Sequence, residues 1–370
     1  MTSSKKGIFY LLTVVLLLTL YVLLDFVFSN TLLKNENCYD YKSYKKGYFY
    51  YLKKNCETNN RFKRNFPSVK VYTDKLGLRV GNNLPERNKD KNILIFGDSF
   101  TFGVGLDYED TYVGIIEKNF NEYNVYNFGV GSYAPTVHLF KLKDAIKNNV
   151  IPDKILLFLD LTDVNDEASR WVDDKIDGIP KRPEEKPAWA KEKTKRKAFI
   201  EKNLKLTEEF ISIVRFHSRN LRSRAQNFIS KDDKNIRIKT SIQGQFTYTK
   251  EEKLDSRFWK KGGFNKGIKK IEDKINEISL IAKKNNSEFY LIIYPWAETL
   301  YFGEKEFSWS KFGEKLCDKK CILINAISEF EKYKKTNKNW VNELYFLNDE
   351  HFNKYGAKLL ADFVIKNLNF

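Results

Sequence analysis

The sequence predicts an α/β protein: a three-layer α/β/α architecture around a central parallel sheet, with one apolar helix before it and a largely helical insertion within it. Three observations predict this class. Short continuous apolar runs such as Ile93–Phe96 and Ile155–Leu159 are typical of strands buried on both faces of a parallel sheet. Helical patterns alternate with these runs, as in βαβ units. A long apolar stretch, Gly7–Phe28, comes first.

This N-terminal stretch is apolar except for Asp25 near its far end, and Lys5 and Lys6 precede it. About twenty such residues cross a bilayer as a helix, and the positive flank favours a cytoplasmic N-terminus. We expect residues 1–29 to form a cytoplasmic tip and one transmembrane helix in the inner (cytoplasmic) membrane, with the rest periplasmic or extracellular. A cleaved signal peptide is the alternative, although the run is long for one and no Ala-x-Ala-like site follows it.

Residues 30–90 are predicted to be a juxtamembrane segment that leads into the core. The segment is polar and rich in tyrosine, and short strands such as Val69–Tyr72 fit its pattern. The tyrosines suit either the headgroup level of a membrane or packing on the following domain.

All four cysteines lie beyond the apolar stretch. Of the possible pairings, Cys38–Cys56 and Cys317–Cys321 close the shortest loops, and we expect these two disulfides. Disulfides suit an oxidising compartment outside the cytoplasm. Four free thiols are the alternative.

The core is predicted in two halves, residues 91–166 and residues 266–370. In chain order, the expected elements are the strand Ile93–Phe96, the helix Glu109–Phe120, the helix Thr136–Asn148, the strand Ile155–Leu159, a helix with buried isoleucines over Ile268–Ile281, the strands Glu288–Tyr294 and Ile322–Ile324, and the helix Lys354–Asn367. The alternation of strands and helices in both halves favours one parallel sheet.

Residues 167–265 differ in character and are predicted to be a basic helical insertion. Prolines interrupt the start, a highly charged stretch follows, and Phe210–Ile229 has the spacing of an amphipathic basic helix. Such a helix could cover a site, bind an anionic partner, or pack by one face with the other in solvent. Trp171, Trp189 and Trp259 are candidates for stacking on a sugar, with packing in the core or a lid as the alternative.

The formal net charge of +17 comes mostly from lysine. Richness in Lys, Asn, Ile and Phe is typical of an AT-rich genome, which needs no functional cause. An acidic glycan or anionic lipid headgroups would be the functional explanation. We expect no nucleic-acid partner, because the sequence has no helix-turn-helix, zinc-finger or aromatic-basic strand signature.

The tetrad Gly97-Asp98-Ser99-Phe100 follows the strand Ile93–Phe96 directly. Ligands of open α/β sheets gather beyond the carboxyl ends of the strands, and Ser99 is predicted to lie there. A serine hydroxyl becomes a nucleophile when a base accepts its proton and a carboxylate orients that base.

The chain has three histidines, His138, His217 and His351, and Asp349 stands two residues before the last. In a loop, residues two apart project to the same side, so Asp349 could hold the imidazole of His351 toward Ser99. This requires a loop before the last helix, since a helix would separate the two side chains. His138 is the second choice of base, and His217 is expected to be structural.

At these residues the chain resembles the SGNH (GDSL-type) hydrolase superfamily. Residues Gly97–Gly103 resemble the first sequence block of that family. The stretch Asp349-Glu350-His351-Phe352-Asn353 resembles its last block. The resemblance implies a flavodoxin-like SGNH fold, with Ser99, His351 and Asp349 as the catalytic triad of a serine esterase or O-acyltransferase that acts through an acyl-enzyme. Many members have aspartate three before histidine, which here is Asn348. The two-residue spacing resembles members that act on bacterial polysaccharides. This implies that the substrate is an ester, most simply an acetyl ester, of a cell-surface glycan.

The resemblance also implies an oxyanion hole. Its backbone donors would be Ser99 and, from the second block Asn127–Tyr133, Ser132 with Gly131 beside it. The third block departs from the family's Gly-x-Asn-Asp: direct alignment puts Thr162 at the asparagine position, and a three-residue shift restores Asn165. Both stay open. Trp296, after the strand Glu288–Tyr294, could shape the substrate pocket or pack in the core.

Other chemistries fit less well. The α/β-hydrolase turn needs Gly-x-Ser-x-Gly, and Thr101 stands where its second glycine would be. No cysteine has a convincing base beside it, no metal site has ordinary ligand spacing, and we expect no cofactor. The alternative function is an inactive SGNH-like scaffold or glycan-binding component of an envelope polysaccharide assembly complex, favoured by the divergent third block.

Overall fold

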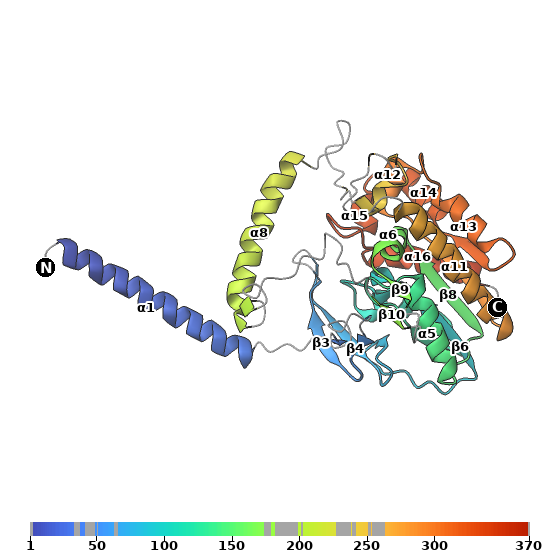
Figure 1. Cartoon of the computed structure of the whole chain (residues 1–370), viewed down its shortest axis with the longest axis horizontal. Coiled ribbons are helices and arrows are strands. Elements are labelled where there is room, and N and C mark those ends of the chain that lie inside the picture. The colour runs from blue at the N-terminus through green and yellow to red at the C-terminus, as the bar shows by residue number, and fades with distance from the viewer. Residues whose placement is uncertain are drawn as a thin grey trace. The chain divides into compact units, whose positions relative to one another are not determined.

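The computed structural model of the chain describes residues 3–32, 38–40, 49, 51–62, 66–173, 179–181, 199–200, 203–226, 238, 242–250, 253 and 263–368. The chain divides into two compact units (Figure 1). One comprises residues 1–36 and 190–228, and the other comprises residues 37–189 and 229–370.

A five-stranded parallel sheet forms the centre of the larger unit, in the order β12-β11-β8-β6-β7. The strands are β6 (Lys91–Phe96), β7 (Tyr123–Asn127), β8 (Lys154–Leu159), β11 (Glu288–Ile293) and β12 (Ile322–Asn325). Every residue of β8 is buried, as its unbroken apolar run predicts for a central strand. The predicted α/β class with a central parallel sheet is confirmed.

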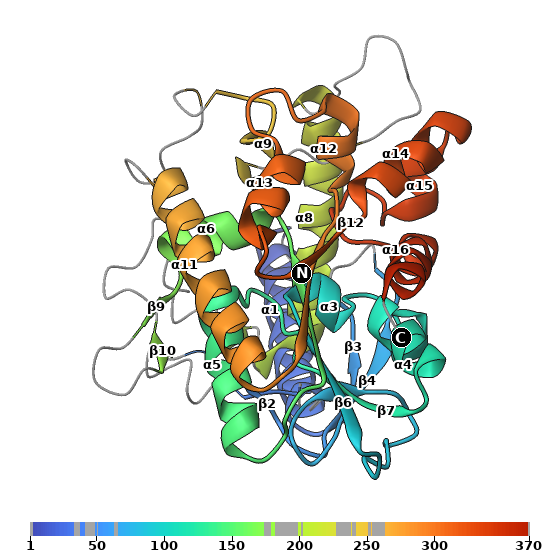
Figure 2. The same cartoon turned by 90° about the vertical axis from the view of Figure 1, so that its right-hand side faces the viewer.

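Helices cover both faces of this sheet. Figure 2 shows α5 (Pro135–Lys147) and α11 (Gly263–Lys284) on one side, and α4 (Tyr112–Asn119) and α16 (Lys354–Asn367) on the other. The remaining helices in the described part of this unit are α3 (Ser99–Phe102), the 3-10 turn η1 (Tyr108–Asp110), α6 (Leu161–Ser169), α9 (Ile242–Gln245), α12 (Ala297–Phe302), α13 (Trp309–Cys317), α14 (Ile327–Thr336) and α15 (Trp340–Leu344). Of the isoleucine stripe of α11, Ile271, Ile275 and Ile278 are buried, and Ile268 and Ile281 at its ends are partly buried.

The segment before β6 forms small antiparallel sheets of its own. β1 (Tyr39–Asp40) pairs with β2 (Tyr51–Leu52), and β4 (Val69–Thr73) pairs with β3 (Glu57–Asn60) and β5 (Arg79–Val80). The predicted strand Val69–Tyr72 therefore exists, but it belongs to this separate sheet. The Cys38–Cys56 disulfide joins the segment to itself, and Cys317–Cys321 closes the end of α13, so both predicted pairings are present.

Arg79 of β5 connects this antiparallel sheet to the loop after α3. The side chain is fully buried, and its guanidinium donates to the backbone carbonyls of Phe102, Gly103 and Leu106. The same guanidinium lies over the Phe102 ring, 4.7 Å from its centroid. One side chain thus supplies hydrogen-bond donors to three carbonyls at the end of α3 and in the loop that follows it.

Replacing Arg79 by methionine is therefore expected to lower the free energy of unfolding by about 2 kcal/mol or more, because buried carbonyls lose their donors. Chemical denaturation of the wild type and the variant measures this. Arg79→Lys is the matched control: it keeps a charge but cannot reproduce the forked geometry, so it should restore part of the loss. Equal stability of all three proteins would show that the hydrogen bonds of Arg79 to these carbonyls do not stabilise the fold.

The smaller unit contains α1 (Ser3–Asn30) and α8 (Lys205–Gln226). α1 holds a stretch, Lys6–Asn30, whose length and mean hydropathy of 2.6 suit a membrane span and equally a signal sequence. The predicted basic helix Phe210–Ile229 is found as α8, which begins five residues earlier. Of the rest of the predicted insertion, β9 (Val172–Asp173) pairs with β10 (Pro180–Lys181), whereas Trp189 and Trp259 lie outside the described residues.

Candidate active site

The strand β6 delivers Ser99 to the edge of the sheet through a tight turn. Asp98 accepts a hydrogen bond from the Phe100 amide at 2.9 Å and so caps the short helix α3, whose first residue is Ser99. Gly97 is required because a Cβ there would lie 1.8 Å from the Thr101 hydroxyl oxygen. Gly129 of the second block also packs against Thr101, since a Cβ there would lie 2.5 Å from the Thr101 side chain.

A loop between α15 and α16 carries Asp349 and His351. The backbone closes on itself, with the Phe346 amide donating to the His351 carbonyl at 3.0 Å and Tyr345 bridged to Phe352. Asn353 ends the loop by capping α16 through the amides of Tyr355 and Gly356. The stretch is thus a loop before the last helix, as the Asp-x-His spacing requires.

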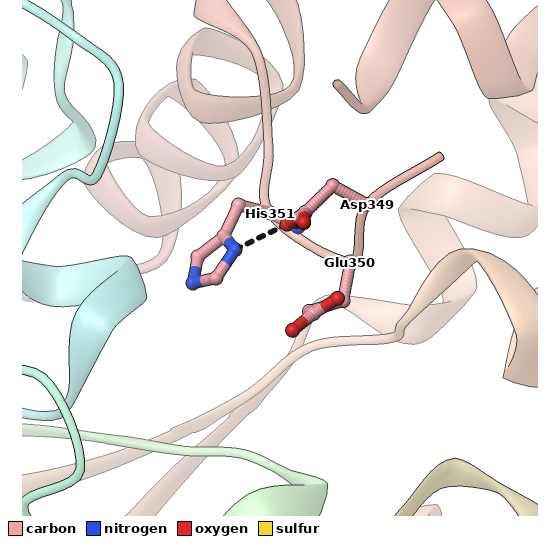
Figure 3. Close-up of side chains that lie close together, drawn as sticks. All are labelled: Asp349, Glu350 and His351. Carbon is pink, nitrogen blue, oxygen red and sulfur yellow. Dashed lines mark hydrogen bonds and ion pairs between the residues drawn. The ribbon is translucent and has the colours of Figure 1, made fainter. Parts of the chain in front are cut away.

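Within this loop, Asp349 Oδ1 lies 2.5 Å from His351 Nδ1 and also accepts from the His351 amide at 3.2 Å (Figure 3). The other ring nitrogen, Nε2, lies 2.8 Å from Ser99 Oγ, across 252 positions of sequence. Both Asp349 and His351 are buried, and Ser99 is half-buried. The structure therefore brings together the serine, histidine and aspartate that the sequence predicted.

Aromatic rings surround the His351 imidazole. Phe100 stacks on it with centroids 4.6 Å apart, and Phe62 meets it edge-on at 5.4 Å. Phe66 lies 6.3 Å away and packs on Phe346 of the histidine loop. Phe62 is 44% exposed, so one aromatic of the antiparallel segment stands at the edge of the site. Sequence reasoning missed Phe62 and Phe66, because no motif links residues 51–80 to the loop of His351.

Buried carboxyl groups lie beside Ser99. Ser99 Oγ is 3.3 Å from Asp98 Oδ2, and the Thr162 hydroxyl bridges Asp98 Oδ2, at 3.2 Å, and Asp160 Oδ1. Burial, with the charge of Asp98 as the second cause, raises the pKa of Asp160 to about 8. Burial also raises the pKa of Asp98 to about 6. At neutral pH the cluster therefore holds at least one carboxyl proton.

This cluster predicts that the protein unfolds at a lower temperature at pH 8 than at pH 5. The folded Asp160 keeps its proton up to about pH 8, whereas the unfolded residue loses it near pH 4. The folded state thus binds more protons between these values, and stability falls as pH rises through this window. Thermal melts across pH 5–8 measure this. Asp160→Asn, which stays neutral, should flatten the slope, and a slope as steep in the variant would contradict the assignment.

Of the two candidates from the third block, Thr162 is the one whose side chain reaches the turn that carries Ser99, through Asp98. Asn165 lies one turn further along α6 and is buried, and its side-chain carbonyl has no hydrogen-bond partner among the described residues. In the second block, Ser132 has a left-handed backbone with φ of 63°, and its carbonyl accepts from the Trp171 indole N–H at 2.8 Å. The oxyanion roles of Gly131, Ser132, Thr162, Asn165 and the Ser99 amide stay predictions.

The tryptophans of the described chain are structural in position. Trp171 is buried and holds Ser132, so it offers no open face for a sugar. Trp296 is also buried, donates to Asp160 Oδ2 at 3.1 Å and lies parallel to Phe100. Trp296 therefore packs in the core next to the site. Its part in a substrate pocket stays a prediction.

His138 lies in the core against the rings of Phe96 and Tyr133. Burial lowers its pKa to about 3, and neither ring nitrogen has a hydrogen-bond partner among the described residues. The imidazole that contacts Ser99 belongs to His351. The structure therefore does not support His138 as the base. His217 lies exposed on α8 in the other unit.

Asp349, Glu350 and His351 also place one ligand atom each within 4.8 Å of one another (Figure 3). A metal ion there would need a ring nitrogen of His351. One nitrogen faces Asp349 and the other faces Ser99, so the geometry suits proton transfer better than coordination.

Comparison with known proteins gives one family model and solved structures of low sequence identity. A family model described as a protein of unknown function (DUF1574) matches residues 5–178, and the sequence matches no curated protein. Among solved structures, TesA is 11% identical over 75% of this chain and 97% of its own, with a TM-score of 0.40. A lipolytic G-D-S-L family protein from Veillonella parvula is 10% identical over 75% and 98%, with a TM-score of 0.39.

A mutant of Axe2, an acetyl-xylooligosaccharide esterase from Geobacillus Stearmophilus, is 12% identical over 76% of this chain and 95% of its own, with a TM-score of 0.39. The chemistry proposed for this chain rests on its own side chains.

Proposed function

We propose that this protein is a membrane-anchored serine esterase or O-acyltransferase of the SGNH type, acting outside the cytoplasm on ester groups of a cell-surface glycan. The observation that carries the proposal is the continuous chain of contacts from Asp349 through His351 to Ser99, with 2.5 Å and 2.8 Å at its two steps. These groups supply a nucleophile, a base and an orienting carboxylate in bonding reach of one another.

In the proposed reaction, Ser99 Oγ forms a bond to the ester carbonyl carbon while its proton passes to His351 Nε2. Asp349 holds Nδ1–H and stabilises the imidazolium that forms. The tetrahedral adduct collapses when the carbon–oxygen bond to the leaving alcohol breaks, and His351 returns its proton to that alcohol. Water or a sugar hydroxyl, deprotonated by the same imidazole, then takes the acyl group from Ser99.

The negative oxygen of the tetrahedral adduct needs hydrogen-bond donors, and losing one typically costs about a hundred- to a thousand-fold in rate. We assign the amides of Ser99 and Ser132 to this role, with Gly131 beside them. Thr162 is the better third donor because its hydroxyl already lies beside the nucleophile turn. If a protonated carboxyl group of Asp98 or Asp160 donates its hydrogen to the Thr162 oxygen, the Thr162 hydroxyl is free to donate to the substrate.

The placement outside the cytoplasm is supported by the apolar helix α1 and by the two disulfides. An exported esterase with a basic surface would meet the acidic and acetylated polymers of the cell envelope. The acetyl group and the glycan are proposed on the resemblance of the Asp-x-His block.

An inactive scaffold within an envelope polysaccharide assembly is the second candidate. The observation that favours it is that the Thr162 hydroxyl is bonded to the carboxyl groups of Asp98 and Asp160. An ionised carboxylate at this place would repel the negative oxygen of a tetrahedral adduct.

Mass spectrometry of the surface glycan from a deletion strain tests the proposal, with complementation by wild type and by Ser99→Ala. Gain of acetyl groups in the deletion strain indicates an esterase, and loss indicates a transferase. Either change should be reversed by the wild type and not by the variant. Full complementation by Ser99→Ala would favour the scaffold.

A further inference from the structure

One acidic residue, Asp25, interrupts the apolar face of α1, and it is fully buried by contacts within the smaller unit. A carboxylate within an apolar span is costly unless it has partners, so its partners indicate what it is for. They come from Ser29, one turn along α1, and from the first turn of α8.

Asp25 and Ser29 together cap the N-terminus of α8. Asp25 accepts from the amides of Leu206 and Thr207 at 3.0 and 2.8 Å, and from the Thr207 hydroxyl at 2.6 Å. Ser29 Oγ accepts from the Lys205 amide at 2.7 Å and donates to Asp25 at 2.8 Å. The amides at a helix start have no partner within the helix, and here side chains of another helix satisfy them.

These contacts set where α8 starts along α1. Asp25 is three residues from the end of the apolar run at Phe28, which is about 4.5 Å of helix. If α1 crosses a membrane, α8 must start at the level where acyl chains meet headgroups. Figure 1 shows α8 beginning beside the C-terminal end of α1 and running away from it. Cleavage of α1 as a signal peptide would remove both capping side chains from the start of α8.

The surface of α8 suits that level. Leu206, Phe210 and Val214 follow one another at helical spacing on one side, and they are 44%, 63% and 51% exposed. Arg215 is exposed as well, and the helical repeat places position 215, with the arginine positions 219 and 222, on the opposite side. Exposed apolar residues on one side and arginines on the other are typical of helices that lie in a membrane interface.

We propose that α8 lies along the outer surface of the membrane that holds α1, with its apolar side among the acyl chains and its arginines at anionic lipid headgroups. The occupant of the exposed apolar side is thus phospholipid. This rests on the proposed membrane anchoring and is independent of the proposed esterase chemistry.

The test uses the full-length protein in vesicles of phosphatidylcholine, with or without phosphatidylglycerol. Single cysteines carry nitroxide labels at Phe210→Cys and Val214→Cys on the apolar side, and at Ser212→Cys and Arg215→Cys as matched controls. The native cysteines are paired in disulfides and do not compete. Collisions with oxygen report lipid, and collisions with an aqueous nickel chelate report water.

We expect positions 210 and 214 to collide severalfold more with oxygen than with nickel, relative to positions 212 and 215. Anionic lipid should strengthen the difference, since each arginine near such a surface contributes about fivefold in partition. Equal exposure of all four labels to nickel would overturn the proposal. If the labels at 210 and 214 were shielded from both oxygen and the nickel chelate, protein would cover them, and the proposal would also be overturned. Shielding by added polygalacturonate instead of anionic lipid would assign α8 to a glycan and overturn it as well.

Asp25→Ala tests the cap, with Asp25→Asn as the control because asparagine is also a good capping residue. The alanine variant should reduce the membrane-bound population of α8 by roughly fivefold, and the asparagine variant should keep most of it. An unchanged collision profile in Asp25→Ala would contradict the cap. Flotation of the protein with the vesicles reports α1 separately, and hydrolysis of a soluble ester reports the active site, so failures of anchoring, of α8 docking and of catalysis are distinguishable.

Discussion

Replacing Ser99 by alanine is expected to lower kcat for a chromogenic acetyl ester by about 10⁶-fold, because the acyl-enzyme can no longer form. The variant removes a half-buried hydroxyl whose contacts are His351 Nε2 and Asp98 Oδ2. Neither contact supports the turn itself, which depends on Asp98 and Gly97. The thermal unfolding temperature should therefore stay close to that of the wild type.

Ser328→Ala, at the exposed start of α14, is the matched control and should change neither activity nor unfolding. Initial rates with purified full-length protein, corrected for the uncatalysed reaction, measure the effect. If Ser99→Ala retained more than a small fraction of wild-type kcat while folding normally, another nucleophile would be responsible.

The second large effect is expected from His351. His351→Gln should lower kcat by a factor similar to that of Ser99→Ala, since residues of such a triad act as a unit. His138→Phe should leave kcat nearly unchanged. The His138 ring is buried and neutral and has no hydrogen-bond partner among the described residues, so an apolar ring of similar shape should fold at least as stably.

The comparison of the two histidine variants is made at saturating substrate, with circular dichroism melts as the check on folding. The double variant Ser99→Ala/His351→Gln should be hardly worse than either single variant. Comparable losses from His138→Phe and His351→Gln would show that the base has been misassigned. Additive losses in the double variant would show that the serine and histidine do not act together.

The parts of this protein that sequence could predict are those with a local pattern. The apolar run of β8 has no polar residue to expose, and the isoleucines of α11 recur at one helical face, so each element indicates its own burial. Ser99 and His351 were predictable for another reason. Ser99 follows a central strand directly, and ligands of such sheets gather beyond the carboxyl ends of the strands, whereas the place of the Asp-x-His loop was expected from the resemblance to the SGNH blocks.

The surroundings of the site could not be predicted, because they depend on contacts between segments that have no common pattern. Arg79 lies on a two-residue strand, and nothing in the sequence indicates that it binds the carbonyls of Phe102 and Gly103. Phe62 reaches His351 from a separate antiparallel segment. The third block was ambiguous for a physical reason: Thr162 and Asn165 both offer a donor, and the fold decides which one meets the nucleophile turn.

The measurement that tests the central claim most directly is intact-mass and peptide mass spectrometry of the full-length protein after treatment with a fluorophosphonate probe. The account predicts a single covalent adduct on Ser99, absent in Ser99→Ala and strongly slowed in His351→Gln. A folded wild-type protein that takes up no probe, or that carries the adduct on another residue, would contradict it.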